Sequence, residues 1–427
     1  MKNPILKIAL PSILTNITVP LLSLIDTAIT GHLGSPIYIG AISVGGALFS
    51  MIFWIFGILR AGTGGLTAQA VGRKDDDECR FILQRSLMVA GLIALTIILL
   101  QQPFSKLAFQ FIDTTPEIAS CAMTYFKILV WGAPAVMCLY SLNGWFIGMQ
   151  NARFPLYVAL VQNIGNIILS LIFVIVFGMK IEGVALGTLL AQYSGLITAL
   201  ALAMRLSGKK IFNFNRQLMK DFGVFFRVNR DIFLRTLCLV AVTVYFTKAG
   251  AHQGETILAV NAILIQLFML FSYFIDGFAY AGEAIGGKCK GARDMTSFKK
   301  MLHDVFLWGT AFAVIFTVIY GFGGMKLIGI LTNEQSVIEM APRYLPYVVA
   351  VPLLGFAAFL FDGIMVGITA TKDMLISMLV ATAAFFVIWF VFNDKYGNDA
   401  LWCAFLTYLL LRGFVQALCL KCTMKSA

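Results

Sequence analysis

The side chains of this sequence most able to do chemistry are carboxylates that lie inside apolar stretches. There are four of them: Asp26, Asp276, Glu283 and Asp362. On insertion scales a charged aspartate at the centre of a membrane helix costs about 2.5–3.5 kcal/mol, so such a group usually faces a cavity or a partner. Because burial favours the neutral form of a carboxyl group, these residues predict uptake and release of a proton or another cation.

Asp26 is the strongest candidate. It stands among apolar and neutral residues in Leu24–Gly34, LIDTAITGHLG, and we expect it in the outer half of the first helix. A structural ion pair with a buried base is the alternative to proton coupling. The obvious base, Arg60, lies well towards the inner end of the second helix, so a direct pair is not expected. Arg60 should bond backbone carbonyls or extend towards the inner surface, and lining the polar interior is its alternative role.

The other three carboxylates lie in the second half of the chain. Asp276 and Glu283 are seven residues apart, so they share one helix face. Glu283 is close to the inner end of its helix, where a solvated helix-end role is the alternative to cation coupling. Asp362 lies deeper, in the segment Phe-Leu-Phe-Asp-Gly, and is the better candidate for a cation site.

Neutral polar side chains recur in three consecutive apolar segments, at positions that lipid would reject. They are Tyr125, Asn143, Asn163, Asn166 and Thr188. Singly, such residues join neighbouring helices through hydrogen bonds. Several of them in consecutive helices beside an embedded aspartate predict one polar cluster around Asp26.

Familiar catalytic and metal motifs do not occur in the sequence, which has no HExxH, Walker loop or nucleophile elbow. The histidines His32, His252 and His303 fall near helix ends or loops. Most of the eight cysteines lie within or beside apolar segments, and the CxxC pair at Cys419 lacks the second pair of ligands that zinc needs. We therefore expect no enzyme, no metal and no cofactor, with an ion gradient as the energy source.

The composition is that of a polytopic membrane protein. Of 427 residues, 59% are hydrophobic and only 12% are charged, against about 25% charged in a soluble domain. The net charge of +11 does not indicate nucleic acid, because the basic residues form no patch interleaved with aromatic ones. Hydropathy predicts twelve helical spans, at about 6–31, 38–71, 81–101, 117–148, 154–178, 183–206, 229–250, 256–286, 298–320, 337–369, 374–393 and 399–421.

The distribution of lysine and arginine predicts the orientation in the membrane. A cytoplasmic N-terminus puts most basic residues on the inner side. The few basic residues then on or near the outer side are Lys106, Lys127, Lys180, Lys248, Lys326, Arg343 and Lys395. We expect both termini to be cytoplasmic and the protein to lie in the inner membrane, with no cleavable signal, because the first helix lacks a small-residue cleavage site.

An internal repeat predicts two lobes, 1–206 and 229–427, joined by a cytoplasmic linker at 207–228. The segment Gln69–Gly72 matches Glu283–Gly286, and Asn143–Gly148 matches Asp362–Gly367. Six spans return the chain to its starting side, so the lobes should be parallel repeats about an axis along the membrane normal, with a cavity between them. Asp26 has no carboxylate at its repeat position, near Val244 or Tyr245, and this asymmetry favours a functional role over a scaffold role.

Four segments taken together resemble the multidrug and toxic compound extrusion (MATE) transporters, specifically the DinF-like branch. They are LIDTAITGHLG, FGILRAGTGGLTAQAVG, IDGFAYAGEAIGG and FDGIMVGITATKD. The resemblance implies an all-α membrane protein of the MATE or MOP type, with twelve helices in two pseudo-symmetric lobes around a central cavity. It also implies antiport of small organic, often cationic and lipophilic, drug-like compounds against protons or sodium, and we expect the protein to act as a monomer in the lipid bilayer.

By the same resemblance, Asp26 is the coupling residue. The expected cavity residues are Tyr125, Asn143, Asn163, Asn166, Ser170, Thr188 and Arg60. Ser170 stands where many DinF-like relatives carry a second aspartate, which leaves a single-aspartate proton switch. Asp276, Glu283 and Asp362 form a candidate second cation site in the C-terminal lobe. The alternatives are a sodium-coupled antiporter, a flippase for lipid-linked precursors, which a cavity rich in arginine and lysine would favour, and an intramembrane enzyme or receptor.

Overall fold

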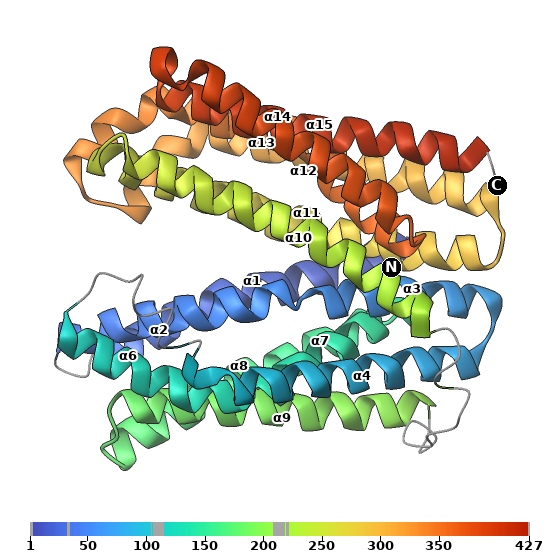
Figure 1. Cartoon of the computed structure of the whole chain (residues 1–427), viewed down its shortest axis with the longest axis horizontal. Helices are drawn as coiled ribbons and strands as arrows, with labels where there is room; N and C mark the ends of the chain where they lie inside the picture. The colour runs from blue at the N-terminus through green and yellow to red at the C-terminus, as the bar shows by residue number, and fades with distance from the viewer. Residues whose placement is uncertain are drawn as a thin grey trace. The chain divides into compact units, whose positions relative to one another are not determined.

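The computed structural model describes residues 3–31, 35–103, 105, 115–207, 218 and 222–425. His32, Lys106 and most of the predicted linker at 207–228 lie outside the described residues. Within these ranges the regular structure is helical, with no strand (Figure 1). The helices of the first half are α1 (Pro4–Gly31), α2 (Pro36–Ile55), α3 (Ile58–Arg73), α4 (Asp76–Leu99), α6 (Pro116–Leu129), α7 (Ala133–Gly148), α8 (Arg153–Leu171) and α9 (Ile181–Ser207).

The second half contains longer and less interrupted helices. They are α10 (Phe222–Ala251), α11 (Glu255–Gly291), α12 (Met295–Leu331), α13 (Gln335–Gly367), α14 (Thr371–Tyr396) and α15 (Asn398–Lys425). In the described part of the chain, 11 helical segments are long and apolar enough to cross a membrane. Together with the 28-residue helix α1, they account for the twelve predicted spans.

Two of the predicted spans are interrupted. The span at 38–71 breaks between α2 and α3, where the amides of Phe56 and Gly57 bond carbonyls three residues back instead of four. The span at 117–148 contains the 3₁₀ turn η1 (Val130–Gly132), and Pro134 follows in the first turn of α7. Proline lacks an amide hydrogen but is tolerated at this position, so it begins a helix here and does not bend the middle of one. One further irregular turn, the π-helical η2 (Ile172–Val176), ends α8.

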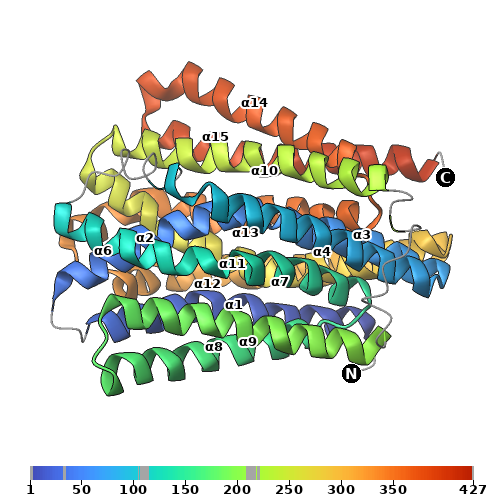
Figure 2. The ribbon, with the colours of Figure 1, turned by 60° about the horizontal axis from the view of Figure 1, so that its bottom comes forward.

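The chain separates into two compact units, Leu14–Phe226 and Arg227–Ala427, with Met1–Ile13 belonging to the second. The beginning of α1 joins the second unit because it packs closely on α11. A Cβ added at Gly277 would lie 2.8 Å from the carbonyl oxygen of Ala9. Within the first unit α8 and α9 lie side by side, and within the second α14 and α15 do so (Figures 1 and 2).

In both units glycines bring neighbouring helices into backbone contact. In the first unit a Cβ at Gly144 or Gly148 of α7 would collide with the carbonyl oxygens of Arg60 or Gly64 in α3. In the second unit a Cβ at Gly363 or Gly367 of α13 would collide with the carbonyl oxygens of Ala279 and Glu283 in α11. Small residues allow membrane helices to approach this closely.

These contacts define the register of the internal repeat. Gly144 and Gly148 of α7 correspond to Gly363 and Gly367 of α13, 219 residues later. Their contact partners in α3 and α11 are also 219 residues apart. The left-handed residues that follow the helices repeat too: Lys74 (φ 59°) with Arg293 (φ 57°), and Gln150 (φ 63°) with Thr369 (φ 53°). The sequence match of Gln69 with Glu283 is therefore wrong by five residues, because the structural counterpart of Glu283 is Gly64.

Filling one of these glycine contacts should destabilise the fold. We expect Gly363→Val to lower the free energy of unfolding by about 1–3 kcal/mol or more, because the new side chain forces α13 away from the α11 backbone. Thermal unfolding of the purified protein in detergent measures the effect. Gly323→Val in α12 is the matched control, because a Cβ at Gly323 meets nothing within 4 Å. If both variants lost the same free energy of unfolding, the close contact of Gly363 with the α11 backbone would be contradicted.

Candidate functional site

Asp26 lies buried on α1, with 8% of its surface exposed. Its neighbours Ile25 and Ile29 pack into an apolar cluster with residues of α2, α6 and α9. The Thr30 hydroxyl donates a hydrogen bond of 2.6 Å to the backbone carbonyl of Asp26, which leaves the carboxyl group itself uninvolved. The carboxyl oxygen Oδ1 is buried and has no hydrogen-bond partner among the described residues. Such an oxygen is costly to bury as a charged group.

A chain of neutral polar groups leads away from this carboxyl group. Tyr125 on α6 interacts electrostatically with Asp26 and shares a side-chain hydrogen bond with Thr188 on α9. The Asn166 amide on α8 donates to the Thr188 hydroxyl over 2.8 Å, and that hydroxyl donates to the Val184 carbonyl over 3.0 Å. The structure thus brings together three of the five predicted polar residues, from three different helices, beside Asp26.

Ser170 lies one helical turn beyond Asn166 and is fully buried. It occupies the contact between α8 and α9, where a Cβ at Gly187 would lie 2.7 Å from the backbone nitrogen of Ser170. Its hydroxyl has no hydrogen-bond partner in the described part of the chain. A small side chain is therefore required at this contact, and its polar atom adds one more uncharged oxygen to the interior of the unit.

The remaining predicted residues of this unit stand apart from that chain. The Oδ1 atom of Asn143 is buried without a partner among the described residues, and Asn143 neighbours the glycine that packs on α3. Asn163 is half-buried and does not take part in the bonded chain. Arg60 lies at the contact of α3 with α7, where an added Cβ at Gly144 would collide with its backbone carbonyl oxygen.

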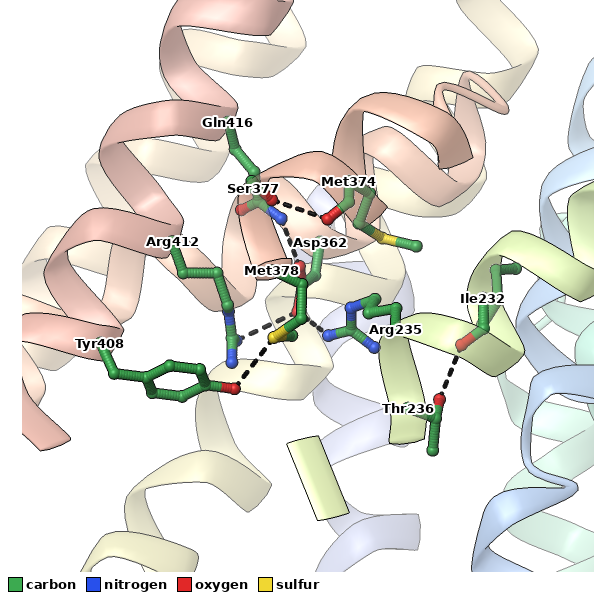
Figure 3. Close-up of polar contacts among 10 residues, drawn as sticks. All are labelled: Ile232, Arg235, Thr236, Asp362, Met374, Ser377, Met378, Tyr408, Arg412 and Gln416. Atoms are coloured by element: carbon green, nitrogen blue, oxygen red, sulfur yellow. Dashed lines mark hydrogen bonds and ion pairs between the residues drawn. The ribbon is translucent and has the colours of Figure 1, made fainter. Parts of the chain in front are cut away.

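In the second unit Asp362 forms an ion-pair cluster that the sequence did not predict (Figure 3). Its Oδ2 atom pairs with Arg235 of α10 and, over 3.0 Å, with Arg412 of α15. Its Oδ1 atom accepts a hydrogen bond of 2.6 Å from Gln416. The Arg412 side chain is only 3% exposed, whereas those of Arg235 and Asp362 are 15% and 14% exposed.

Asp276 and Glu283, the other two members of the candidate second cation site, lie on α11 of the same unit. Asp276 interacts electrostatically with Arg412, and Glu283 is fully buried, with its backbone carbonyl against Gly367. No group of three or more histidine, cysteine, aspartate or glutamate side chains that could hold a metal ion occurs in the described ranges. Asp362 is occupied by two guanidinium groups, so a bare cation meets positive charge there.

Arg235 is the functional candidate that sequence reasoning missed. The orientation prediction explained Arg235, like Arg227 and Arg230, only as one of the basic residues on the cytoplasmic side. A distinguishing feature was present, because Arg235 follows the apolar residues Ile232, Phe233 and Leu234. A basic residue beyond an apolar stretch of the same helix indicates a buried partner.

The repeat positions of the Asp26 cluster are aromatic in the second unit. At the 219-residue offset, Asp26, Asn166 and Ser170 correspond to Tyr245, Phe385 and Trp389. These three rings lie together, with the Tyr245 centroid 6.5 Å from that of Phe385 and 6.4 Å from that of Trp389. The Trp389 indole donates a hydrogen bond of 3.1 Å to the Tyr245 hydroxyl. The titratable site of the first unit therefore has an uncharged counterpart.

A duplicated six-helix arrangement of apolar helices with buried polar clusters defines the class of polytopic membrane transport proteins. The family model MatE matches the chain twice, over residues 11–172 and 232–393. DNA damage-inducible protein F of Escherichia coli is 37% identical over 416 residues, which cover 96% of this chain and 90% of that protein. The chain belongs to the MatE family, whose members are membrane transporters.

More distant relatives share the fold over nearly the whole length. The multidrug export protein MepA of Staphylococcus aureus is 22% identical, over 93% of this chain and 89% of that protein. A crystal structure of a MATE protein in complex with MaL6 superimposes with a TM-score of 0.86 at 19% identity, over 99% of this chain and 96% of that chain. An outward-facing multidrug resistance MATE transporter of the MOP superfamily gives a TM-score of 0.81 at 20% identity, with the same coverage.

Removing the shared hydroxyl should weaken the polar cluster. We expect Thr188→Val to lower the free energy of unfolding by about 1–3 kcal/mol, because Asn166 and Tyr125 lose their common partner at nearly constant volume. Unfolding of the purified protein followed by tryptophan fluorescence measures this loss. Thr198→Val on the same helix is the control, since that hydroxyl bonds only its own helix, at the Ser194 carbonyl. A larger loss for the control would contradict the assigned network.

Proposed function

We propose that this chain exports small organic compounds in exchange for protons by alternating access, with Asp26 as the proton-carrying group. The observation that carries the proposal is the buried Oδ1 atom of Asp26, which has no hydrogen-bond partner and no cationic partner among the described residues. A carboxylate in such surroundings is costly when ionised and comparatively inexpensive when protonated. The name of the S. aureus relative, a multidrug export protein, supports the choice of organic substrates.

The neutral cluster gives protonation a structural consequence. An ionised carboxylate can only accept hydrogen bonds, whereas a protonated one also donates. The Oδ1 atom of Asn166 is buried without a donor, so the first unit offers an acceptor to a new donor in its interior. Protonation from the acidic outer side thereby repacks α1 and lowers substrate affinity, and inward exposure releases the proton. One charge moved through about 100 mV supplies about 2.3 kcal/mol for this cycle.

We further propose two lobes, 1–206 and 229–427, joined by a cytoplasmic linker at 207–228, in a protein that works as a monomer in the inner membrane. The double match of the family model supports two equivalent lobes, because its two copies begin and end at the same interval along the chain. Substrates are expected to be lipophilic compounds, many of them cationic.

Sodium coupling and lipid-precursor flipping are the alternative functions. The uncharged oxygens of Tyr125, which interacts with Asp26, and of Thr188, which bonds Tyr125, are groups that could coordinate sodium as well. The paired arginines at Asp362 are the observation that favours a flippase, since its substrates carry phosphates. Antiport against protons remains the proposal because the Asp26 cluster carries a single carboxylate.

Replacing Asp26 should abolish proton-driven transport. Proteoliposomes with an acidic lumen, diluted into alkaline buffer, should accumulate ethidium as protons leave. We expect Asp26→Asn to reduce this uptake to the level of protein-free vesicles, because the asparagine side chain cannot carry a proton. Fluorescence of the accumulated dye measures the rate, and a circular-dichroism spectrum like that of the unaltered protein shows that the variant is folded.

Glu117→Gln is the matched control, since it neutralises an exposed carboxylate at the start of α6 in the same unit. It should leave uptake unchanged. A second set of vesicles carries a sodium gradient at equal pH. Uptake driven by sodium alone would replace the proton mechanism with sodium coupling, and full proton-driven uptake by Asp26→Asn would remove Asp26 from the mechanism.

The proposed orientation can be tested with reporter fusions. A green fluorescent protein attached after Ala427 should fluoresce in cells, because it folds to its fluorescent form on the cytoplasmic side. The same reporter inserted at Lys180, between η2 and α9, should remain dark. Alkaline phosphatase fused at the two positions should give the opposite pattern of activity. A dark C-terminal fusion with active phosphatase at Ala427 would reverse the proposed topology.

A further inference from the structure

Basic residues gather in the second unit where α11 ends and α12 begins. We call this group the α11–α12 basic patch, and all of its residues are exposed: Lys288, Lys290, Arg293, Lys299 and Lys300. A tight turn joins the two helices, because the amides of Arg293 and Asp294 donate hydrogen bonds to the carbonyls of Lys290 and Cys289, over 3.1 Å and 2.9 Å. The positive charges therefore lie on one short turn and on the helix ends beside it.

The patch lies on the outside of this pair of helix ends. Phe298 and Met301 of α12 are buried, and they face α11. A Cβ added at Gly286 would lie 3.1 Å from Met301 Cε and 3.6 Å from Phe298 Cε2. Lys299 and Lys300 stand between these two residues in the sequence and are exposed. The packing of α12 on α11 thus turns the lysines outwards.

The exposed face of α12 continues from Lys300 as an apolar stripe. Leu307, Val314, Val318 and Phe322 follow at intervals of seven and four residues, and they are 61%, 47%, 51% and 89% exposed. Residues at these intervals share one helix face. In a membrane-spanning helix such an exposed apolar face contacts lipid. Lys300 is seven residues before Leu307, about 10 Å along the helix, so its charge lies close to the lipid headgroups.

The protein does not neutralise these charges. The ion pairs of the described residues include none of the five basic side chains. The carboxylate of Asp294 caps α12, where it accepts a hydrogen bond of 2.9 Å from the Ser297 amide. Lys299 and Lys300 follow at the beginning of α12, the end of a helix whose dipole favours anions. Helix stability therefore does not account for the two lysines.

The internal repeat shows that the turn itself does not require a basic patch. The segment 288–300 contains five basic residues and one acidic residue, whereas the equivalent segment 69–81 of the first unit contains three basic and four acidic residues. The two turns have the same backbone, with φ 59° at Lys74 and 57° at Arg293. In the first unit Arg80 pairs with Asp77. A turn at the equivalent place is thus formed with its charges balanced.

We propose that the α11–α12 basic patch binds the headgroups of anionic phospholipids. Lysine and arginine donate charge-assisted hydrogen bonds to phosphate oxygens. Clusters of four to eight basic residues directly beyond a membrane helix attract anionic lipid. The lipid chains lie along the exposed apolar face of α12, which an acidic protein or a nucleic acid would not use. This inference goes beyond the proposed function and requires neither a particular transported compound nor proton coupling.

Native mass spectrometry of the full-length protein, released from detergent micelles, tests the patch. Phosphatidylglycerol and phosphatidylcholine with identical chains are titrated separately, and the fraction of protein with bound lipid gives an apparent affinity for each. We expect the unaltered protein to bind phosphatidylglycerol about tenfold or more tightly than phosphatidylcholine. A higher concentration of ammonium acetate should reduce this preference, because salt screens the attraction between exposed charges.

Three matched variants separate the patch from general effects of charge. The test variant combines Lys290→Gln, Lys299→Gln and Lys300→Gln, and its phosphatidylglycerol affinity should fall about tenfold, to that for phosphatidylcholine. Arginine at the same three positions should keep the preference, since the charges remain. The control variant removes three exposed lysines from the opposite helix ends of the same unit: Lys248→Gln, Lys326→Gln and Lys395→Gln. The control should bind both lipids like the unaltered protein.

Four results would overturn the proposal. They are equal affinities of the unaltered protein for the two lipids, an undiminished preference in the glutamine variant, an equal loss in the control variant, and a loss of preference in the arginine variant. Equal lipid affinities together with binding of a polyglutamate peptide would assign the patch to an acidic protein instead. A circular-dichroism spectrum like that of the unaltered protein shows that each variant is folded.

Discussion

Charge buried among apolar helices has to be neutralised, and the two units of this transporter do so in different ways. Asp26 lies among uncharged oxygens and amides, with no basic group paired to it in the described residues. Asp362 is neutralised by two guanidinium groups held at one carboxylate. The first arrangement fits the proposed proton-carrying role of Asp26, whereas the second surrounds its carboxylate with charged and amide donors. The polar chemistry of each unit therefore follows from how that unit accommodates a buried carboxyl group.

This difference is built on a duplicated scaffold. Glycine contacts and left-handed turn residues recur at one constant offset, so the two units share backbone geometry. The side chains in equivalent places have diverged: Asp26 and Asn166 correspond to Tyr245 and Phe385, and Asn143 corresponds to Asp362. Backbone packing leaves the polar interior free to change, because the contacts that define the helix pairs involve main-chain atoms and glycines. A duplicated backbone therefore carries two different polar interiors.

The helices and the polar cluster of the first unit were predictable from the sequence. Hydropathy indicated the helices, because a span needs a run of apolar residues, and an embedded aspartate near Tyr125, Asn166 and Thr188 indicated the first polar cluster. The break at η1 and the pairing of Arg235 with Asp362 were not predictable in this way. Hydropathy does not distinguish a continuous helix from two joined by a 3₁₀ turn, and an ion pair between residues 127 positions apart depends on helix rotation. The Gln69–Glu283 match failed because small apolar motifs recur within one helix.

The glycine contacts also bear on which helices can move. Where the Gly144 and Gly363 backbones touch a neighbouring helix, sliding or rotation would drive main-chain atoms into one another. We therefore expect the pairs α3 with α7 and α11 with α13 to move as units. A helix packed through side chains can shift more readily, as at Gly309 and Gly324 of α12, where an added Cβ would meet the side chains of Leu360 and Leu345. On this view amide hydrogen exchange should be slowest in the glycine-paired helices and fastest in the peripheral ones, so that the protein's internal mobility follows the distribution of its smallest residue.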